Sequence, residues 1–450
     1  MRRLAARLLR WLAEVAVRFY YPRRSVQGLA NVPADGGAVY VANHPNGLLD
    51  PLVLRVAIGR RVRFLAKSTL WGNPFGRLAM DAFQCLPVYR QRDVGAGEQR
   101  SETVSRNEET FARCRAELAA GGDVALYPEG TSHAEPQLKP LKTGAARIAL
   151  SAAAEVGAAT LGGRMPRLVP VGSHYENPAL FRSGVHLVVG EPIDLRPFVP
   201  QYQSDVNQGI AALTDAIRER LDMLVLQAET RELLEGIARV ASWTGAGPAD
   251  EAPERLHART RELLLAYAKL RASDPDQVER LAQQAREYAR LLGRMGIRDP
   301  WALEAPLLSF GRISITLGRT LLLAPAMPWG VVTSWLPYRL AGWAARKATK
   351  DEDVLGTMKM IAGAAFLAAA WLIEAVVIGV VAGVGWAVAS LVAAPVAGYA
   401  ALRFSENLRA TAEAIRHLGW RASAETVRRL SARRKRLAED VAQALRQVKP

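Results

Sequence analysis

The chain has 450 residues, half of them hydrophobic, and its 59 Lys and Arg against 43 Asp and Glu give a formal net charge of +16. This length exceeds what one hydrophobic core usually organises and argues against a single compact domain. The positive charge favours an anionic partner, which leaves nucleic acid, anionic lipid and a phosphorylated substrate open. The two cysteines, Cys85 and Cys114, lack metal-ligand spacing and imply no disulfide scaffold.

Residues 1–25 are predicted to form a retained helix that lies in the membrane interface. Apolar residues from Leu4 to Val17 recur at helical spacing with arginines between them. No small-residue cleavage site like that of a secretory signal is present. The same pattern is also compatible with a helix packed on the protein's own core.

Residues 26–200 alternate short apolar runs with helical stretches, which predicts an α/β domain with a mixed sheet covered by helices. The expected strands are Ala38 to Ala42, Arg63 to Ala66, Gln84 to Val88, Asp123 to Tyr127, Leu168 to Gly172 and Val185 to Val189. The expected helices between them are Pro51 to Ile58, Pro74 to Ala82, Glu98 to Ala120 and Thr143 to Val156.

Residues 201–305 shift in composition to Ala, Leu, Glu, Gln and Arg, which is typical of helices. Gly245 to Pro253 is the evident break between two helical blocks. We interpret this helical region as solvated and without chemistry of its own.

Residues 306–404 are predicted to be the membrane region, with a two-helix hairpin near 360–402. Glu374 is the only charged residue between Met360 and Leu402, a stretch long enough for two spans. It is either a functional intramembrane acid or a carboxyl that is protonated or faces a partner helix. Basic flanks on both sides place both ends, and with them the active domain, in the cytoplasm, so the protein is expected at the cell membrane with its catalytic domain facing the cytoplasm.

Two neighbouring segments are assigned from their composition. Residues 306–337 contain arginines and four prolines, which argue for an interfacial or re-entrant segment over a straight span. Residues 405–450 form a basic amphipathic tail that either rests on anionic membrane lipid or is an ordinary solvated helix. The long uncharged hairpin argues for a membrane partner and against nucleic acid.

The stretch VYVANHPNGLLDP places His44 where an apolar strand ends, the point at which a sheet usually presents its site. Pro45-Asn46-Gly47 has turn chemistry, so the chain can fold back and bring Asp50 to His44. A carboxylate on one ring nitrogen would leave the other free as a base near neutral pH. The alternative is a helix-capping Asp and an unrelated surface His.

The stretch DVALYPEGTSH is a second strand that runs into small and polar residues. Glu129 at its exit can hydrogen-bond substrate hydroxyls, and the N–H groups around Gly130 and Thr131 can approach a phosphate or an oxyanion. Lys142 lies just before the next helix, whose N-terminus also favours anions. Each of these signals is weak by itself.

The stretch LPVYRQR places Arg90 and Arg92 after a third strand. Their guanidinium groups can bind a phosphate through two parallel hydrogen bonds. Arginines at strand ends are also common on ordinary surfaces, so the pair does not decide between the two interpretations.

Together, NHPNGLLDP, LPVYRQR, LYPEGTSH and LVPVGSHY resemble the four sequence blocks of the glycerolipid (PlsC-like) acyltransferase family, in order and spacing, over residues 29–193. The family usually has four residues between His and Asp, whereas this chain has five. The five-residue variant, the phrase PEGTSHAEPQLKPLKTGAARIAL and the C-terminal hydrophobic segments resemble the fungal-type glycerol-3-phosphate/dihydroxyacetone-phosphate acyltransferases and their bacterial relatives.

The resemblance implies a role for each matching residue. His44 would take the proton of the acceptor hydroxyl, and Asp50 would orient His44. Arg90 or Arg92 together with Lys142 would bind the acceptor phosphate. The substrate-binding residues Glu129, Gly130 and Thr131 would shape the acceptor site.

The resemblance also implies the reaction. The chain is expected to move a fatty acyl group from acyl-CoA or acyl-carrier protein to glycerol-3-phosphate or dihydroxyacetone phosphate in phospholipid biosynthesis, without a metal or cofactor. The alternatives are a 1-acylglycerol-3-phosphate acyltransferase and a lipid-binding scaffold on the same fold. Nucleic acid is not expected as a partner, because net charge alone would motivate that interpretation.

Overall fold

The computed structural model describes residues 2–35, 37–90, 100–158, 165–245, 252–295, 318–421 and 424–448. The chain divides into two compact units. The first unit comprises Met1–Arg231 together with Asp351–Thr357, and the second comprises Glu232–Lys350 and Met358–Pro450. Each unit has its own packing and is described by itself.

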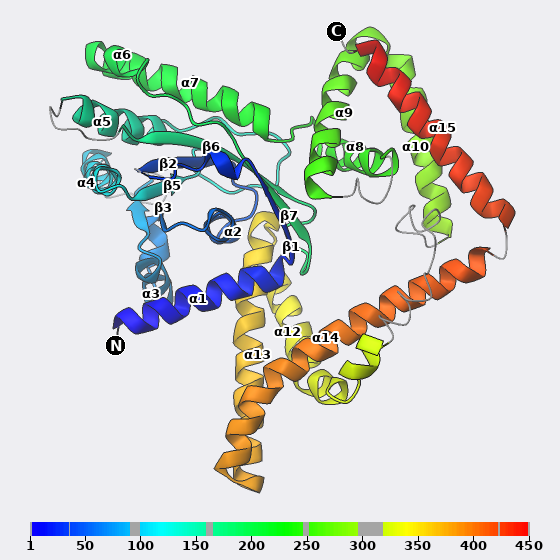
Figure 1. The fold of residues 1–450 in the computed structure, drawn as a ribbon. Helices are drawn as coiled ribbons and strands as arrows, with labels where there is room; N and C mark the ends of the chain where they lie inside the picture. Colours follow the sequence, from blue (N-terminus) through cyan, green and yellow to red (C-terminus); the bar gives the residue numbers. More distant parts are fainter. Residues whose placement is uncertain are drawn as a thin grey trace. The chain divides into compact units, whose positions relative to one another are not determined.

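The first unit is built on a seven-stranded sheet with the order β1-β7-β6-β2-β5-β3-β4 (Figure 1). All neighbouring strands are parallel except β6 and β7, which confirms the predicted mixed sheet. The strands are β1 Arg23–Gln27, β2 Ala38–Ala42, β3 Val62–Lys67, β4 Leu86–Val88, β5 Asp123–Leu126, β6 Arg167–Tyr175 and β7 Gly184–Val189.

Strand β1 is the one strand of this sheet that the sequence pattern did not predict. Its sequence is RRSVQ, which has neither an apolar run nor a clear alternation. It lies at the sheet edge and pairs with β7 alone, with Arg23 opposite Gly184. An edge strand of this kind is formed by backbone pairing to a neighbour, which a local pattern does not record.

Helices cover the sheet on both faces (Figure 1). Helices α4, α5 and α7 share the main core with strands β2, β5 and β6, through residues such as Val39, Val124, Ile148 and Leu213. The helices of this unit are α1 Arg2–Tyr20, α2 Leu49–Ile58, α3 Pro74–Ala82, α4 Arg100–Ala119, α5 Gly144–Ala158, α6 Val199–Ser204 and α7 Val206–Leu224, with 3-10 turns at Leu29–Asn31 and Ser68–Trp71. Helix α1 packs against α2 and α3.

Helix α1 presents its apolar face outward. The exposed side chains lie at helical spacing and include Leu4, Leu8, Trp11, Leu12, Val15 and Phe19. On the opposite side, Val17 is fully buried. Helix α1 thus packs on the domain through one side and exposes an apolar stripe on the other, and its position in a membrane interface stays a prediction.

The second unit contains a helical bundle. Helices α8 Arg231–Trp243, α9 Pro253–Ser273, α10 Pro275–Arg294 and α15 Ala424–Val448 make it up. Its core includes Trp243, Leu263, Tyr288 and Leu437. Helix α15 lies in the basic tail, and its apolar residues pack against α9 and α10.

Three further helices, α12 Met327–Ala348, α13 Glu352–Ala382 and α14 Val384–Arg421, lie between α10 and α15 in the chain. Residues 352–382 and 384–409 are long and apolar enough to cross a membrane. The chain reverses at Gly383, whose φ of 93° is the left-handed conformation that glycine favours. The Trp329 indole N–H of α12 donates to Glu374, so this carboxylate faces a partner helix. Of the 306–337 segment, residues 306–317 lie outside the described residues.

Candidate active site

The candidate site lies at the carboxyl ends of two neighbouring parallel strands. Strands β2 and β5 are paired with Val41 opposite Leu126, so the residues that follow them emerge at one edge of the sheet. His44 follows β2, and Glu129 follows β5. This is the edge at which open α/β sheets bind ligands.

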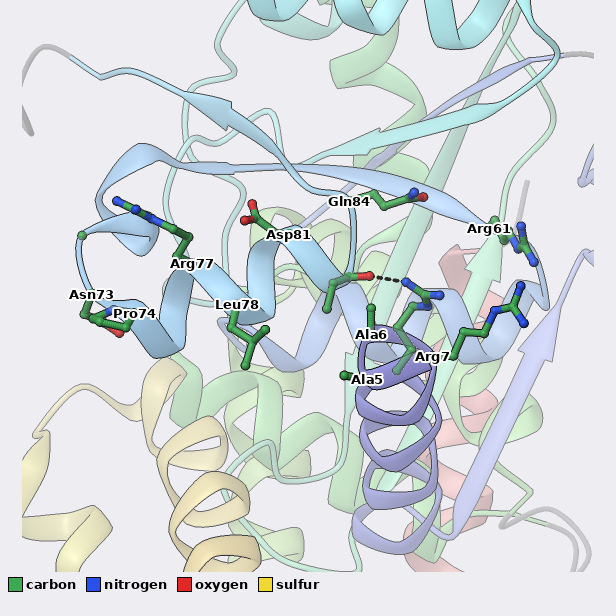
Figure 2. Close-up of a pocket in the computed structure, with 13 residues that line it drawn as sticks. Ala5, Ala6, Arg7, Arg61, Asn73, Pro74, Arg77, Leu78, Asp81 and Gln84 are labelled. Atoms are coloured by element: carbon green, nitrogen blue, oxygen red, sulfur yellow. Dashed lines mark hydrogen bonds between the residues drawn. The ribbon is translucent and has the colours of Figure 1, made fainter. Parts of the chain in front are cut away.

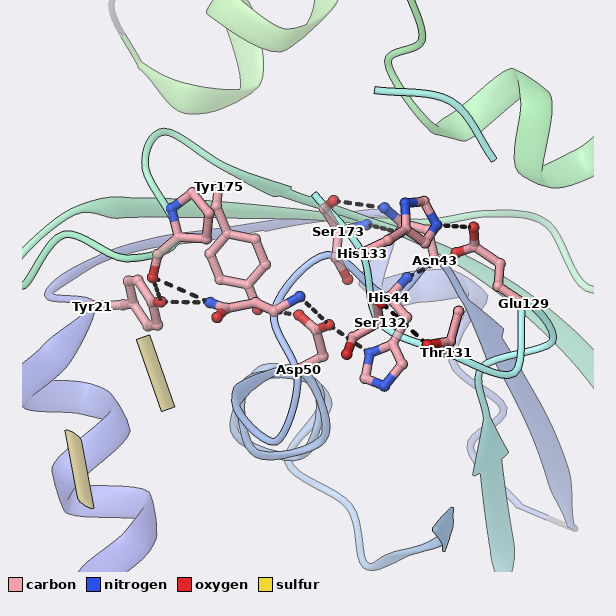
Figure 3. Close-up of polar contacts among 12 residues, drawn as sticks. Tyr21, Asn43, His44, Asp50, Glu129, Thr131, Ser132, His133, Ser173 and Tyr175 are labelled. Carbon is pink, nitrogen blue, oxygen red and sulfur yellow. Dashed lines mark hydrogen bonds and ion pairs between the residues drawn. The ribbon is translucent and has the colours of Figure 1, made fainter. Parts of the chain in front are cut away.

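The turn between His44 and Asp50 closes on itself. The amide of Leu49 donates to the carbonyl of Asn46 at 3.0 Å, and Gly47 has a φ of +43°. Asp50 then begins helix α2 and turns back toward the strand end. His44 Nδ1 lies 2.8 Å from Asp50 Oδ2, so the five-residue spacing permits the contact (Figure 3).

The contact sets the tautomer of His44. Because a carboxylate accepts, Nδ1 carries the proton and Nε2 holds the lone pair. Among the described residues, no protein group hydrogen-bonds Nε2. The His44 side chain is 18% exposed and that of Asp50 1%. The imidazole therefore presents a free basic nitrogen, held from behind by a buried carboxylate.

Asp50 has two further donors. The amide of Asn46 donates to Oδ2 at 2.8 Å, and the Tyr175 hydroxyl donates to Oδ1 at 2.6 Å. Burial raises the pKa of Tyr175 well above its ordinary value, and the nearby Asp50 charge adds to this, so the phenol remains a donor. Tyr175 was not predicted as a site residue, although it ends the fourth block, LVPVGSHY.

Substitution Tyr175→Phe is expected to lower kcat about tenfold and to leave KM for the acceptor nearly unchanged. A hydrogen bond to a buried carboxylate is worth about 1.5–3 kcal/mol, and only part of that reaches the imidazole. Steady-state kinetics would check the split. Tyr40→Phe is the matched control, because the buried Tyr40 hydroxyl has no hydrogen-bond partner among the described residues. Equal loss in both variants would contradict a positioning role for Tyr175.

Tyr127 forms one wall of the site. Its ring stacks on the His44 imidazole with centroids 3.9 Å apart and an interplanar angle of 10°. It follows β5 directly, so the second strand end holds the ring plane while Asp50 holds one ring nitrogen. Together the two contacts leave the imidazole little freedom to rotate.

The Glu129 carboxylate is hydrogen-bonded to other groups of the protein. The His44 amide donates to Oε1 at 3.0 Å and the Lys139 amide donates to Oε2 at 2.9 Å. His133 Nε2 also contacts Oε2 (Figure 3). The sequence suggested that Glu129 binds substrate hydroxyls, but its side chain is fully buried. In this geometry Glu129 joins the two strand-end loops.

The loop after Glu129 lies beside the side chains that are expected to bind the acceptor phosphate. Gly130 has a φ of +71°, and its carbonyl accepts from Arg90 Nη1 at 2.9 Å. The Lys142 side chain lies over Gly130, where an added Cβ would meet Lys142 Cγ at 3.3 Å. The Thr131 hydroxyl donates to the Ser132 carbonyl at 3.3 Å. The loop thus brings Arg90, Lys142 and Thr131 together.

Arg92 lies outside the described residues.

The two cysteines do not take part in the site. Burial raises the pKa of both Cys85 and Cys114 to about 12, which makes each a poor nucleophile near neutral pH.

The start of α13 packs against the turn between His44 and Asp50, within the first unit. An added Cβ at Gly356 would meet the Pro178 carbonyl oxygen at 2.6 Å and Asn46 Oδ1 at 3.0 Å. An added Cβ at Gly47 would meet the Asp353 carbonyl oxygen at 3.0 Å. Asn46 is fully buried, and its amide nitrogen donates to the Tyr21 hydroxyl at 2.6 Å. No local sequence signal linked these distant segments.

Comparison with known proteins assigns the domain. Residues 23–172, which include both strand ends and the turn that joins His44 to Asp50, match the model of the Acyltransferase family. This segment is an acyltransferase domain. The expected resemblance to glycerolipid acyltransferases is thereby confirmed.

Individual relatives of the acyltransferase domain are distant. An uncharacterized acyltransferase of Schizosaccharomyces pombe is 24% identical over 64% of this chain and 54% of its own length. Glycerol-3-phosphate O-acyltransferase 1 of Saccharomyces cerevisiae is 22% identical over 79% of this chain and 59% of its own. A chloroplastic 1-acyl-sn-glycerol-3-phosphate acyltransferase of Brassica napus is 29% identical over 40% of this chain and 48% of its own. The chain thus spans about half the length of these curated relatives.

Among solved structures, the 1-acyl-sn-glycerophosphate acyltransferase of Thermotoga maritima matches with a TM-score of 0.33 and 17% identity. The match covers 50% of this chain and 83% of that one.

Proposed function

We propose that the chain is a membrane-bound O-acyltransferase that acylates a hydroxyl of glycerol-3-phosphate or dihydroxyacetone phosphate. The observation that carries the proposal is the 2.8 Å contact of His44 Nδ1 with Asp50, which leaves Nε2 free at the edge of an acyltransferase domain. An imidazole held in this way is a general base for an alcohol. The donor is acyl-CoA or acyl-carrier protein.

The reaction needs only this base and a bound acceptor. His44 Nε2 removes the proton of the acceptor hydroxyl as its oxygen attacks the thioester carbonyl. The new ester C–O bond forms, the C–S bond breaks, and the departing thiolate takes the proton from the imidazolium. Asp50 stabilises the imidazolium between the two transfers.

The acceptor phosphate would be held by Arg90 and Lys142. Both contact Gly130, and Lys142 has no ion-pair partner among the described residues. The arginine donates to the Gly130 carbonyl through Nη1, and its guanidinium carries a positive charge beside that loop. From the resemblance, Arg92 joins them. Each of these groups presents a donor and a positive charge to a phosphate dianion.

Membrane attachment and orientation belong to the same proposal. The two apolar helices α13 and α14 would hold the chain in the cell membrane. Basic residues flank this hairpin on both sides, which by the positive-inside rule supports a cytoplasmic position for the acyltransferase domain.

A 1-acylglycerol-3-phosphate acceptor is the second candidate, because the Brassica napus relative carries that activity in its name. The two acceptor types share a phosphate and a hydroxyl and differ in one acyl chain.

The test is a transfer assay with purified full-length protein. Radiolabelled acyl-CoA and acyl-carrier protein are each offered with glycerol-3-phosphate, dihydroxyacetone phosphate and 1-acylglycerol-3-phosphate. Labelled product from either of the first two acceptors supports the proposal, and product from the third alone favours the second candidate. Binding of lysolipid without transfer from any donor would identify a lipid-binding scaffold and contradict both.

A further inference from the structure

A cavity of about 1290 Å³ lies beside helix α1, apart from the His44 site. It is bordered by α1, by α3 and by the start of β3, and it shares no lining residue with the candidate active site (Figure 2). Its charged side chains are Arg7, Arg10, Arg61, Arg77 and Asp81. Four guanidinium groups against one carboxylate make the cavity strongly cationic.

The arginines of this cavity are largely unneutralised. Asp81 is already occupied, because it accepts from the Trp71 indole N–H at 2.9 Å. Within the described parts of the chain, Arg7, Arg61 and Arg77 have no carboxylate partner within ion-pair distance. Arg7 and Arg61 lie together at one end of the cavity, and Arg77 lies at the other end (Figure 2). The charges of Arg7 and Arg61 act on Arg10, so these three arginines form one cluster. Like charges held together in this way favour the binding of an anion between them.

Arg10 has the most buried position in the group. It donates to the Ala82 carbonyl at the end of α3, which fixes its guanidinium at the cavity wall. Burial lowers its pKa, and the positive charges of Arg55, Arg61 and Arg7 lower it further. The repulsion among these groups is the energy that a bound anion would relieve.

Exposed apolar side chains flank the cavity. On α3, Phe75 is 64% and Leu78 56% exposed. Leu78 also lines the cavity itself. An amphipathic helix in a bilayer places its apolar face among the acyl chains and its cationic side chains at the level of the headgroups.

We propose that Arg7, Arg10 and Arg61 of this cavity bind the phosphate of an anionic glycerophospholipid whose acyl chains lie along the exposed Phe75 and Leu78 of α3. Arginine is suited to the task, because its fork of N–H groups matches phosphate oxygens. The site is a lipid-binding one and is separate from the acyl-transfer reaction, so it does not depend on the function proposed above. A soluble phosphate compound, such as the nucleotide end of a thioester donor, would have no use for the apolar rim.

The test is native mass spectrometry of the full-length protein in detergent, titrated with phosphatidylglycerol or with phosphatidylcholine. The wild type is expected to retain phosphatidylglycerol preferentially. In the double variant Arg7→Gln/Arg61→Gln, its apparent affinity is expected to fall about 25-fold, since each arginine near an anionic surface contributes about fivefold. The matched control, Arg113→Gln/Arg220→Gln, removes the same charge from exposed positions on α4 and α7.

Three outcomes would overturn the proposal. The first is equal loss of phosphatidylglycerol in the control and the cavity variant, which would mean that net charge alone is responsible. The second is undiminished binding in the cavity variant. The third is displacement of the lipid by adenosine 3′,5′-bisphosphate, which would assign the cavity to a soluble nucleotide. Far-UV circular dichroism and the lipid-free Tm verify that each variant is folded.

Discussion

Substitution His44→Ala is expected to lower acyl transfer about 10³-fold, within the range that general acid–base catalysis contributes. The residue offers the free Nε2 and is held by Asp50 at 2.8 Å and by the stacked ring of Tyr127. Because the imidazole is partly exposed, its removal should leave the fold and membrane attachment intact. Release of radiolabelled ester product measures the effect.

His174→Gln is the control for this experiment. His174 lies on β6, and its Nε2 is 3.0 Å from the Leu224 carbonyl, a contact that a glutamine amide can reproduce. The His174→Gln variant should retain full turnover. Asp50→Asn should approach the His44→Ala loss, because an amide in place of the carboxylate no longer stabilises the imidazolium. Residual turnover near the wild-type rate in His44→Ala would rule out the general-base role.

Substitution Gly356→Ala is expected to lower kcat about 10²-fold without releasing the protein from the membrane. A Cβ at this position would lie 2.6 Å from the Pro178 carbonyl and 3.0 Å from Asn46 Oδ1, so backbone must move. The Asn46 amide binds Asp50, and displacement of this turn changes the angle of the base toward the hydroxyl. Misplacement by about 1 Å can cost this much in rate.

Gly363→Ala in the same helix is the matched control, because an added Cβ there meets nothing within 4 Å. Both substitutions replace glycine with the better helix former, so any general effect on α13 should be the same or favourable. Turnover measured on equal amounts of membrane-bound protein separates the two. A similar loss in both variants would show that α13 acts through its own stability and does not position the turn.

Much of the fold could be predicted locally. Strand β2 was predicted with its observed bounds, and helix α3 likewise, because apolar runs, Pro74 at the helix start and the asparagine cap before it are local signals. Strand β1 could not be predicted, since its polar sequence becomes a strand only by pairing with β7.

The candidate site divides in the same way. The residue types at the strand ends, His44 and Glu129 among them, can be read from the chain because polar residues follow apolar strands. The partners cannot. The Tyr175 hydroxyl contacts Asp50 although the two residues are 125 positions apart. The Glu129 carboxylate accepts hydrogen bonds from protein donors. Burial and hydrogen-bond partners depend on which segments the sheet order brings together.

The sequence by itself determined the α/β class, the motif blocks and the two apolar helices, because each is recorded in composition or in local spacing. Only the tertiary structure decided that a five-residue turn brings His44 to Asp50, that the apolar face of α1 points outward, and that four arginines line one cavity. The physical reason is that these are contacts or exposures of side chains from distant segments. Their free energies depend on distances that the order of residues does not contain.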